Sequence, residues 1–208
     1  MRWILLLIFL TSCLIALFSC AQGEGNTIFN SDTESDTLHI HERMRNKAKE
    51  LSQFLANQSE YSDELAILID MRQQSGKNRL FVFDMQNLTV LSKGLVAHGI
   101  GSETGVEDSL KFSNVPGSLC TSLGKYKIGA AYIGNFGRAY KLHGLEFSND
   151  RAFERYVVLH SYNCVPDDEQ TFPICTSEGC TIVSENYFAV LDVFIRNSEK
   201  PIILEVFY

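Results

Sequence analysis

The chain has 208 residues, of which 45% are hydrophobic, and its formal charge is −7. This apolar content excludes general disorder, and the acidic balance argues against a nucleic-acid partner, which would require basic patches. A chain of this size usually forms one domain with its own hydrophobic core once an export signal has been removed.

Residues 1–20 have the pattern of an export signal. One arginine is followed by an uncharged apolar run from Trp3 to Phe18 and then by small residues. The run is short for a bilayer-spanning helix, which needs about 20 apolar residues, so a permanent membrane helix is the less favoured interpretation. The motif "LFSC", which ends at Cys20, resembles a bacterial lipobox, in which the cysteine is lipidated and begins the mature chain.

Two alternatives to this lipidation site remain open. "LTSC", ending at Cys13, also fits the motif but leaves a very short apolar segment, and ordinary cleavage after Ala21 would leave no lipid. We expect lipidation at Cys20, which would attach an exported lipoprotein of the bacterial cell envelope to a membrane, facing the periplasm. The polar residues 21–38 are then expected to form a flexible tether between anchor and body.

Residues 39–75 show a helical pattern. Apolar residues recur every three or four positions, at Met44, Ala48, Leu51 and Leu55 and again at Leu65, Leu68 and Met71. Ser62, followed by two acidic residues, predicts the start of a second helix there. The segment is expected to pack on the body or to lead into it.

From residue 76 onward the apolar period changes to two. "RLFVFDM" and "LTVLSKGLVAHG", joined by "QN", predict a hairpin, and "GKYKIGAAYIG", "RAYKLHGLE" and "RYVVLH" predict further strands. "SENYFAVLDVFIRNS" predicts an amphipathic helix capped near Ser184, and "PIILEVFY" a last strand. The sequence therefore predicts an α+β fold with a mainly antiparallel or mixed sheet, in which residues 76–208 form the main, β-rich domain.

The cysteines of the body allow three interpretations. In an oxidising compartment, four of them would usually form two disulfides. A zinc site with His160 fits poorly, because the ligand spacing lacks the tight pairs of structural zinc sites. A thiol nucleophile at Cys180 would have His160, at the end of "YVVLH", as its base, and Gly179 would allow a tight turn with amide donors beside the sulfur. From the residues alone, disulfide and catalysis remain equally open. The four cysteines of the body are Cys120, Cys164, Cys175 and Cys180.

Several ordered motifs favour the catalytic interpretation. "FSN-x-PGS", "SLG-x-Y", "LHGLE", "ND-x-A", "VVLH" and "S-x-GC" follow one another between His98 and Ser184. In this order they resemble the murein L,D-transpeptidase catalytic-domain family, the YkuD-like cysteine peptidyl-transferases. The resemblance covers roughly half the chain, and the strand and helix after these motifs also fit.

The resemblance implies a role for each matching residue. Cys180 would be the nucleophile and His160 its base, and the carbonyl of Ser161 would orient the imidazole. Gly179 and Cys180 would supply backbone oxyanion donors, while Ser177 would shape the loop. The chain departs from the family at Ser161, where glycine is more common, at Glu178, where His or Trp is typical, and in the "CTIV" that ends the motif. A carboxylate at position 178 would raise the pKa of the thiol.

Three further expectations concern the surroundings of this pair. His98 and His143 most simply support a turn or the wall of the cleft. Because the family tends to place "HG-x-GS" near the cleft, the resemblance also makes His98 a candidate for contact with substrate. Residues 161–176 would form a flap that a Cys164–Cys175 disulfide could staple.

The resemblance implies an enzyme that acts on peptidoglycan stem peptides through a cysteine acyl-enzyme. Transfer to an amine would form a 3→3 cross-link, and transfer to water would be L,D-carboxypeptidase activity. No metal or organic cofactor is expected. The alternative is a non-catalytic envelope-binding or structural lipoprotein that keeps the fold, with Cys180 bonded to Cys175.

Overall fold

The computed structural model describes residues 31–106 and 109–208. The predicted export signal over 1–20, the lipidation site Cys20 and most of the predicted tether lie outside these residues. Among the described helices, none has the length and apolar character needed to cross a bilayer.

Within the described residues, one mixed sheet of eight strands forms the body, in the order β3-β2-β1-β8-β4-β5-β6-β7. The inner pair β1 and β8 is parallel, and so is the edge pair β6 and β7, while the other neighbours are antiparallel. The predicted α+β class with a mixed sheet is confirmed. The strands are β1 (Leu65–Asp70), β2 (Leu80–Asp84), β3 (Thr89–Gly94), β4 (Gly124–Gly134), β5 (Gly137–Gly144), β6 (Val158–Ser161), β7 (Thr181–Val183) and β8 (Ile203–Phe207).

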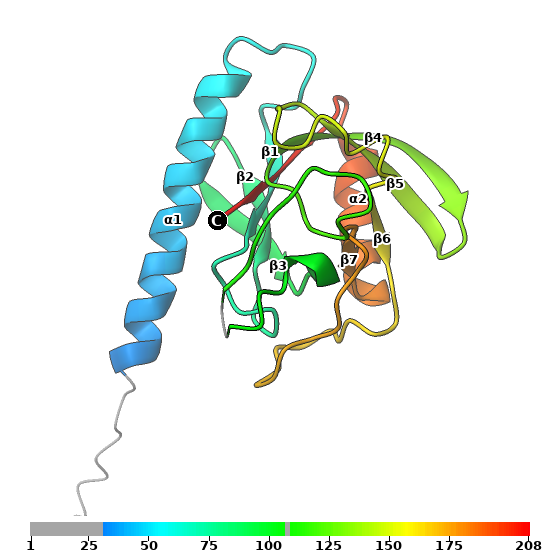
Figure 1. The fold of residues 1–208 in the computed structure, drawn as a ribbon. Helices are drawn as coiled ribbons and strands as arrows, with labels where there is room; N and C mark the ends of the chain where they lie inside the picture. Colours follow the sequence, from blue (N-terminus) through cyan, green and yellow to red (C-terminus); the bar gives the residue numbers. More distant parts are fainter. Residues whose placement is uncertain (1–30, 107–108) are drawn as a thin grey trace, which may run out of the picture.

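Two helices cover opposite faces of this sheet (Figure 1). α1 (Ser31–Leu55) packs on one face against Ala66 and Leu68 of β1, and α2 (Glu185–Asn197) belongs to the core on the other face, with Ile67 and Ile69. Alternate residues of β1 point to opposite faces, so the strand is buried on both. A short 3₁₀ helix, η1 (Ile100–Ser102), follows β3.

The second predicted helix, from Ser62 to Met71, is wrong. The run "LAILID" is apolar up to its last residue, Asp70, and forms β1, hydrogen-bonded to both β2 and β8. The oxygen of Ser62 does accept backbone N–H bonds from Glu64 and Leu65, both at 3.3 Å, but the chain then continues as a strand. Apolar spacing alone could not separate a buried strand from a helix here.

α1 is joined to the sheet by ion pairs as well as by apolar packing. Arg43 Nη2 lies 2.6 Å from the fully buried carboxylate of Asp70 in β1, and Lys47 Nζ lies 3.7 Å from Glu205 in β8. The helix begins at Ser31, so the predicted tether is corrected for residues 31–38. The N-terminal helix is thus an integral layer of the body.

The elements around the candidate site follow the sequence closely. β4 matches "GKYKIGAAYIG" residue for residue, and the β2–β3 hairpin turns at the predicted "QN". α2 starts after Ser184, whose side-chain oxygen accepts the N–H of Tyr187 at 3.1 Å. The capping residue directly follows β7, so α2 begins at Glu185, five residues after Cys180.

Candidate active site

Cys180 lies in the tight bend that leads into β7, and its thiol is free. Gly179 before it has φ +109°, a conformation that side-chain-bearing residues rarely adopt. A Cβ on Gly179 would lie 3.0 Å from the carbonyl oxygen of Cys120 and 3.3 Å from Arg155 Nη2. The glycine is therefore required both by its φ angle and by the closeness of the loop that carries Cys120.

Ser177 holds this bend together. Its hydroxyl donates to the carbonyl of Cys180 at 2.7 Å and accepts the N–H of Gly179 at 3.1 Å. Its own backbone N–H donates to the carbonyl of His98 at 2.8 Å, and its carbonyl accepts the N–H of Ile100 at 2.7 Å. The N–H of Gly179, expected as an oxyanion donor, is thus engaged within the bend in this structure.

His160 is placed in β6 between β5 and β7, and it is 6% exposed. Its Nδ1 lies 2.9 Å from the carbonyl oxygen of Ser161. Because a carbonyl oxygen can only accept, Nδ1 carries the proton and Nε2 keeps a free lone pair. This tautomer is the one that a general base requires at Nε2.

The strand register brings the sulfur and the imidazole to one face. β6 and β7 are parallel, with Leu159 opposite Thr181 and His160 opposite Ile182. Extending this register by one residue places Cys180 opposite Val158, two positions from His160 and on the same face of the strand. Cys180, directly before β7, and His160, in β6, therefore lie at the same edge of the sheet.

The surroundings keep both groups neutral at rest. Burial raises the pKa of the Cys180 thiol, and the carboxylate of Glu178 raises it further, whereas the backbone N–H of Val158 and the charge of Arg155 act in the opposite direction. Burial lowers the pKa of His160 more than its bond to Ser161 raises it. The resting pair is therefore thiol and imidazole, and a thiolate forms when the proton passes to Nε2.

Arg155 is a member of the site that sequence reasoning missed. Its Nη2 donates to the carbonyl of Cys120 at 2.6 Å, and its Nη1 donates to the carbonyl of Ser113 at 2.9 Å and to the hydroxyl of Ser122 at 3.1 Å. The guanidinium thus fixes the 113–122 loop against the nucleophile bend and adds positive charge near the sulfur. Its position at the start of "RYVVLH" was visible, but its partners are distant in sequence.

Tyr156 is a second missed residue. It has φ +58°, an unusual conformation for a residue with a Cβ, and its carbonyl oxygen lies 3.6 Å from Cys180 Sγ, which donates to it. Its own side chain is 84% exposed. No sequence signal marks a residue that contributes through a backbone carbonyl.

The other predicted residues lie around this pair. The Cys164–Cys175 disulfide is present, so Cys175 is not bonded to Cys180. Cys120 is a buried free thiol that donates to the carbonyl of Gly101 at 3.0 Å. His143 stacks on Phe153, with ring centroids 5.1 Å apart. No cluster of three or more metal-ligating side chains occurs among the described residues.

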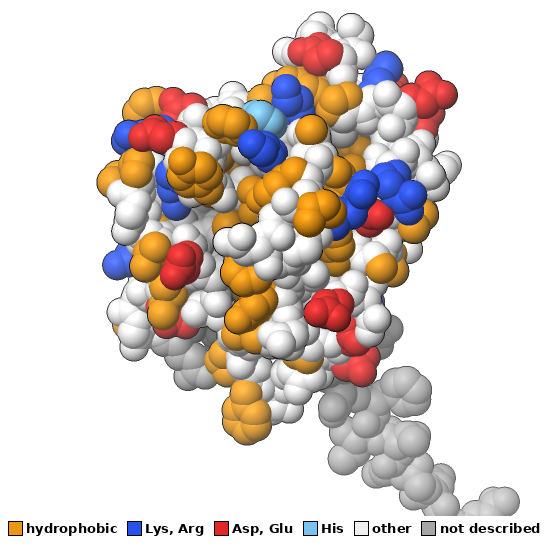
Figure 2. All heavy atoms as spheres, turned by 90° about the vertical axis from the view of Figure 1, so that its right-hand side faces the viewer, with side chains coloured by type: hydrophobic (Ala, Val, Ile, Leu, Met, Phe, Trp, Pro, Cys, Tyr) orange, Lys and Arg blue, Asp and Glu red, His pale blue; other side chains and the backbone are white. Residues whose placement is uncertain are grey.

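The surface near the hairpin β4–β5 is mixed in character. Figure 2 views the molecule from the right-hand side of Figure 1 and shows hydrophobic patches separated by basic and acidic side chains. Ile133, Phe136 and Phe153 are exposed hydrophobic side chains of this region. Despite the net charge of −7, this face is not uniformly acidic.

Comparisons with known proteins agree with this fold. The family model described as "L,D-transpeptidase catalytic domain" matches residues 37–203. A search of curated proteins found no match.

Solved structures with a similar fold include three from different bacteria. The L,D-transpeptidase of Xylanimonas cellulosilytica has 13% identity and a TM-score of 0.39, over 70% of this chain and 61% of that one. An L,D-transpeptidase of Mycobacterium smegmatis has 13% identity and a TM-score of 0.41, over 70% of this chain and 59% of that one. The helical cell shape determining protein Pgp2 of Campylobacter jejuni has 14% identity and a TM-score of 0.45, over 70% of this chain and 48% of that one. The matched region thus spans about half to three fifths of those chains. Since the family model covers most of the sequence, the chain belongs to the L,D-transpeptidase catalytic domain family.

Proposed function

We propose that this protein cleaves peptidoglycan stem peptides through an acyl-enzyme on Cys180. One observation carries the proposal: a free thiol lies directly before β7, the neighbour of the strand that carries a buried imidazole, and the bond of this imidazole's Nδ1 to the Ser161 carbonyl leaves Nε2 as a base. Family membership supplies the substrate class. The proposed catalytic domain of residues 76–208 must be extended to include β1, because this strand pairs with β2 and β8 inside the same sheet.

The chemistry follows from these two groups. Cys180 Sγ attacks the carbonyl of the third stem residue while His160 Nε2 takes the thiol proton. The tetrahedral intermediate collapses to a thioester, and the imidazolium gives its proton to the departing amine of the terminal D-Ala. An incoming amine or water then loses a proton to His160, attacks the thioester and regenerates the thiol. Division into two acyl transfers lowers the barrier that direct amide exchange would face.

The oxyanion of each intermediate needs backbone donors. Gly179 N–H is occupied by Ser177 at 3.1 Å, so the N–H of Cys180 is the proposed first donor. Rotation of the Ser177 side chain about its Cα–Cβ bond would move the accepting oxygen away from Gly179 N–H and add this N–H as a second donor during the reaction. Arg155 holds the neighbouring loop through the Cys120 carbonyl and keeps positive charge near the developing anion.

The experiment is incubation of the protein with disaccharide tetrapeptide, followed by measurement of released D-Ala. Wild type should release D-Ala, Cys180→Ala should not, and Cys120→Ser is the matched control because it removes the other free thiol of the described residues. A disaccharide tripeptide product identifies hydrolysis, whereas a dimer identifies cross-linking. Absence of D-Ala release together with failure of iodoacetamide to modify Cys180 in the native protein would support the non-catalytic envelope-binding alternative.

We also propose export to the bacterial envelope and lipidation at Cys20, with the body in the periplasm. The motif "LFSC" supports this proposal. Metabolic labelling with palmitate should mark wild type and Cys13→Ser but not Cys20→Ser. Equal labelling of both variants would contradict Cys20 as the site.

A further inference from the structure

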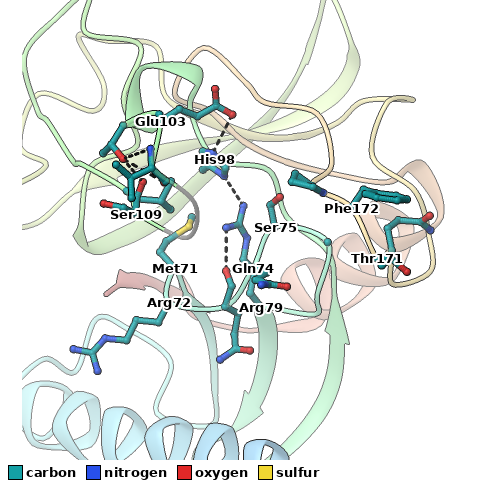
Figure 3. Close-up of a pocket in the computed structure, with 18 residues that line it drawn as sticks. Met71, Arg72, Gln74, Ser75, Arg79, His98, Glu103, Ser109, Thr171 and Phe172 are labelled. Atoms are coloured by element: carbon teal, nitrogen blue, oxygen red, sulfur yellow. Dashed lines mark hydrogen bonds and ion pairs between the residues drawn. The ribbon is translucent and has the colours of Figure 1, made fainter. Parts of the chain in front are cut away.

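A second candidate site lies apart from the candidate catalytic pair. It is a cavity of about 310 Å³ between the β1–β2 turn, the loop after η1 and the flap, and neither Cys180 nor His160 lines it (Figure 3). Met71, Leu110 and Phe172 give it apolar walls, and Arg79, His98 and Glu103 contribute charged or titratable groups. A pocket of this kind, apolar with a few convergent polar groups, is typical of small-molecule sites.

A buried arginine lies behind the histidine of this cavity. Arg79 is 1% exposed; its Nε donates to the carbonyl of Val96 at 2.8 Å, and its Nη2 lies 2.9 Å from His98 Nδ1. A guanidinium has only donors, so Nδ1 of His98 must accept and the imidazole proton must be on Nε2. The arginine therefore determines the tautomer of His98.

The same arginine keeps His98 neutral. Burial, together with the charge of Arg79, lowers the pKa of His98 to about 4. Burial lowers the pKa of Arg79 to about 9, which still leaves the guanidinium charged at neutral pH. His98 is thus a neutral N–H donor polarised by a positive charge on its other nitrogen.

This donor has no acceptor among residues 31–106 and 109–208. His98 is 6% exposed, and its Nε2 is buried without a hydrogen-bond partner. The carboxylate of Glu103 has its Oε1 at 3.9 Å from His98 Nε2, too far for a hydrogen bond. Figure 3 shows the Glu103 carboxylate beside the ring, on the side opposite Arg79. Buried N–H groups are nearly always paired, so this atom indicates a missing acceptor.

We propose that this cavity binds a small carboxylate, of amino-acid or dipeptide size, whose oxygen accepts the Nε2–H of His98. The donor and the positive charge behind it favour an anionic acceptor over a neutral one and disfavour cations. The ligand carboxylate takes the position beside His98 that the Glu103 carboxylate now approaches. The side chain of Glu103 is 55% exposed, so it can turn into solvent without losing buried contacts. The binding site is independent of the proposed catalysis at Cys180.

Direct contacts between the flap and the β1–β2 turn form one wall of the cavity. Gln170 N–H donates to the carbonyl of Gly76 at 2.8 Å, and Ile174 N–H donates to Ser75 Oγ at 3.2 Å. A Cβ on Gly76 would lie 2.5 Å from the carbonyl oxygen of Phe172, so the flap lies directly on the turn. The disulfide between Cys164 and Cys175 closes the base of this flap.

The test is a titration of ¹⁵N-labelled protein with acetate, alanine and alanylalanine, with acetamide as the neutral control. The side-chain Nε2–H resonance of His98 is followed by ¹H–¹⁵N spectroscopy. We expect saturable shifts with the carboxylates and none with acetamide. Tighter binding of alanine or alanylalanine than of acetate would identify an amino-acid or peptide ligand, while equal affinities would identify a general carboxylate site.

Three variants make the outcome decisive. His98→Phe should weaken binding at least tenfold, His98→Gln should retain part of it because its amide N–H is a donor, and Glu103→Gln should tighten it severalfold. Unchanged affinity in His98→Phe, or no saturable shift of His98 in wild type, overturns the proposal. If His98→Phe does not fold, the wild-type and Glu103→Gln titrations decide. Cys180→Ala should bind normally, which separates this result from the fate of the proposed enzyme activity.

Discussion

The ring of Phe136 lies against the imidazole of His160, with centroids 5.0 Å apart and an angle of 19° between the planes. Phe136 stands at the turn of the β4–β5 hairpin, and Tyr162 contacts it edge-on at 5.3 Å. Phe136 itself is 56% exposed, so it forms the outer cover of a histidine that is almost completely buried. Burial is the main cause of the lowered pKa of His160. The hairpin thus influences both the orientation and the protonation of the base.

Phe136→Ala should raise the pKa of His160 toward its ordinary value, because water would reach the ring. A larger fraction of His160 would then be protonated at pH 6, and the rate of D-Ala release or of Cys180 alkylation should fall by up to about fourfold there, because about a quarter of the imidazole is still neutral at that pH when its pKa is about 6.5. NMR titration of His160 and a pH–rate profile provide the measurements. Ile133→Ala, on the same hairpin and 77% exposed, is the control. An unchanged profile in Phe136→Ala would contradict this role.

Glu178→Gln should accelerate alkylation of Cys180. After burial, the carboxylate of Glu178 is the other influence that raises the pKa of the thiol, so its removal increases the thiolate fraction at a given pH. Because Glu178 is exposed, solvent screens the effect, and we expect an increase of about twofold to fivefold. Iodoacetamide kinetics between pH 6 and 9 measure it. Glu185→Gln, in the first turn of α2, is a suitable control, and slower alkylation in Glu178→Gln would refute the electrostatic reading.

Gly179→Ala should abolish most activity, whereas Gly117→Ala should not. Both glycines have positive φ, +109° and +77°, but a Cβ at 179 would lie 3.0 Å from the Cys120 carbonyl, and a Cβ at 117 would meet nothing within 4 Å. Both variants should therefore lose about 1 kcal/mol to backbone strain, while only Gly179→Ala displaces the nucleophile, with about a hundredfold loss in rate. Chemical denaturation and D-Ala release separate the two effects; equal rates in the two variants would disprove the steric argument.

Much of the fold could be predicted from local patterns. Alternation in "GKYKIGAAYIG" and the cap at Ser184 depend on neighbouring residues, and both elements have the expected bounds. The strand β1 was missed because its apolar run is buried on both faces, between β2 and β8, and that burial depends on residues far along the chain. Long-range pairing, rather than propensity, decides such a segment.

The residues of the candidate site could be predicted from the sequence only where their side chains carry the chemistry. Cys180 and His160 stand out by residue type and by motif, but Arg155 acts through the carbonyls of Ser113 and Cys120, and Tyr156 through its own carbonyl. Such contacts depend on loop positions that no spacing rule describes. The Arg79–His98 pair was also hidden, because nothing in "KNRLFVF" indicates that Arg79 is buried.

A buried acid at the centre of the sheet permits a test of how α1 is held. Glu205 of β8 is 4% exposed and lies 3.7 Å from Lys47 of α1 and 3.6 Å from Lys125 of β4. Burial raises its pKa more than the two lysines lower it. Glu146, which also binds Lys125, differs: burial raises its pKa, but the bonds to Lys125 outweigh this, and its pKa is lowered.

Glu205→Gln should therefore gain stability relative to wild type as the pH rises from 4 to 7. A carboxyl with a raised folded-state pKa binds its proton more tightly in the folded state, so its contribution is favourable at low pH and is lost as the pH rises through that pKa. We expect near equality at pH 4 and a gain of about 1 kcal/mol in the free energy of unfolding at pH 7. Glu146→Gln should show the opposite trend, because a lowered pKa contributes stability above the unfolded-state value. Urea denaturation at several pH values measures both variants. Parallel pH profiles of the two variants would show that the lysines, rather than burial, dominate at Glu205, and that its charge stabilises the attachment of α1.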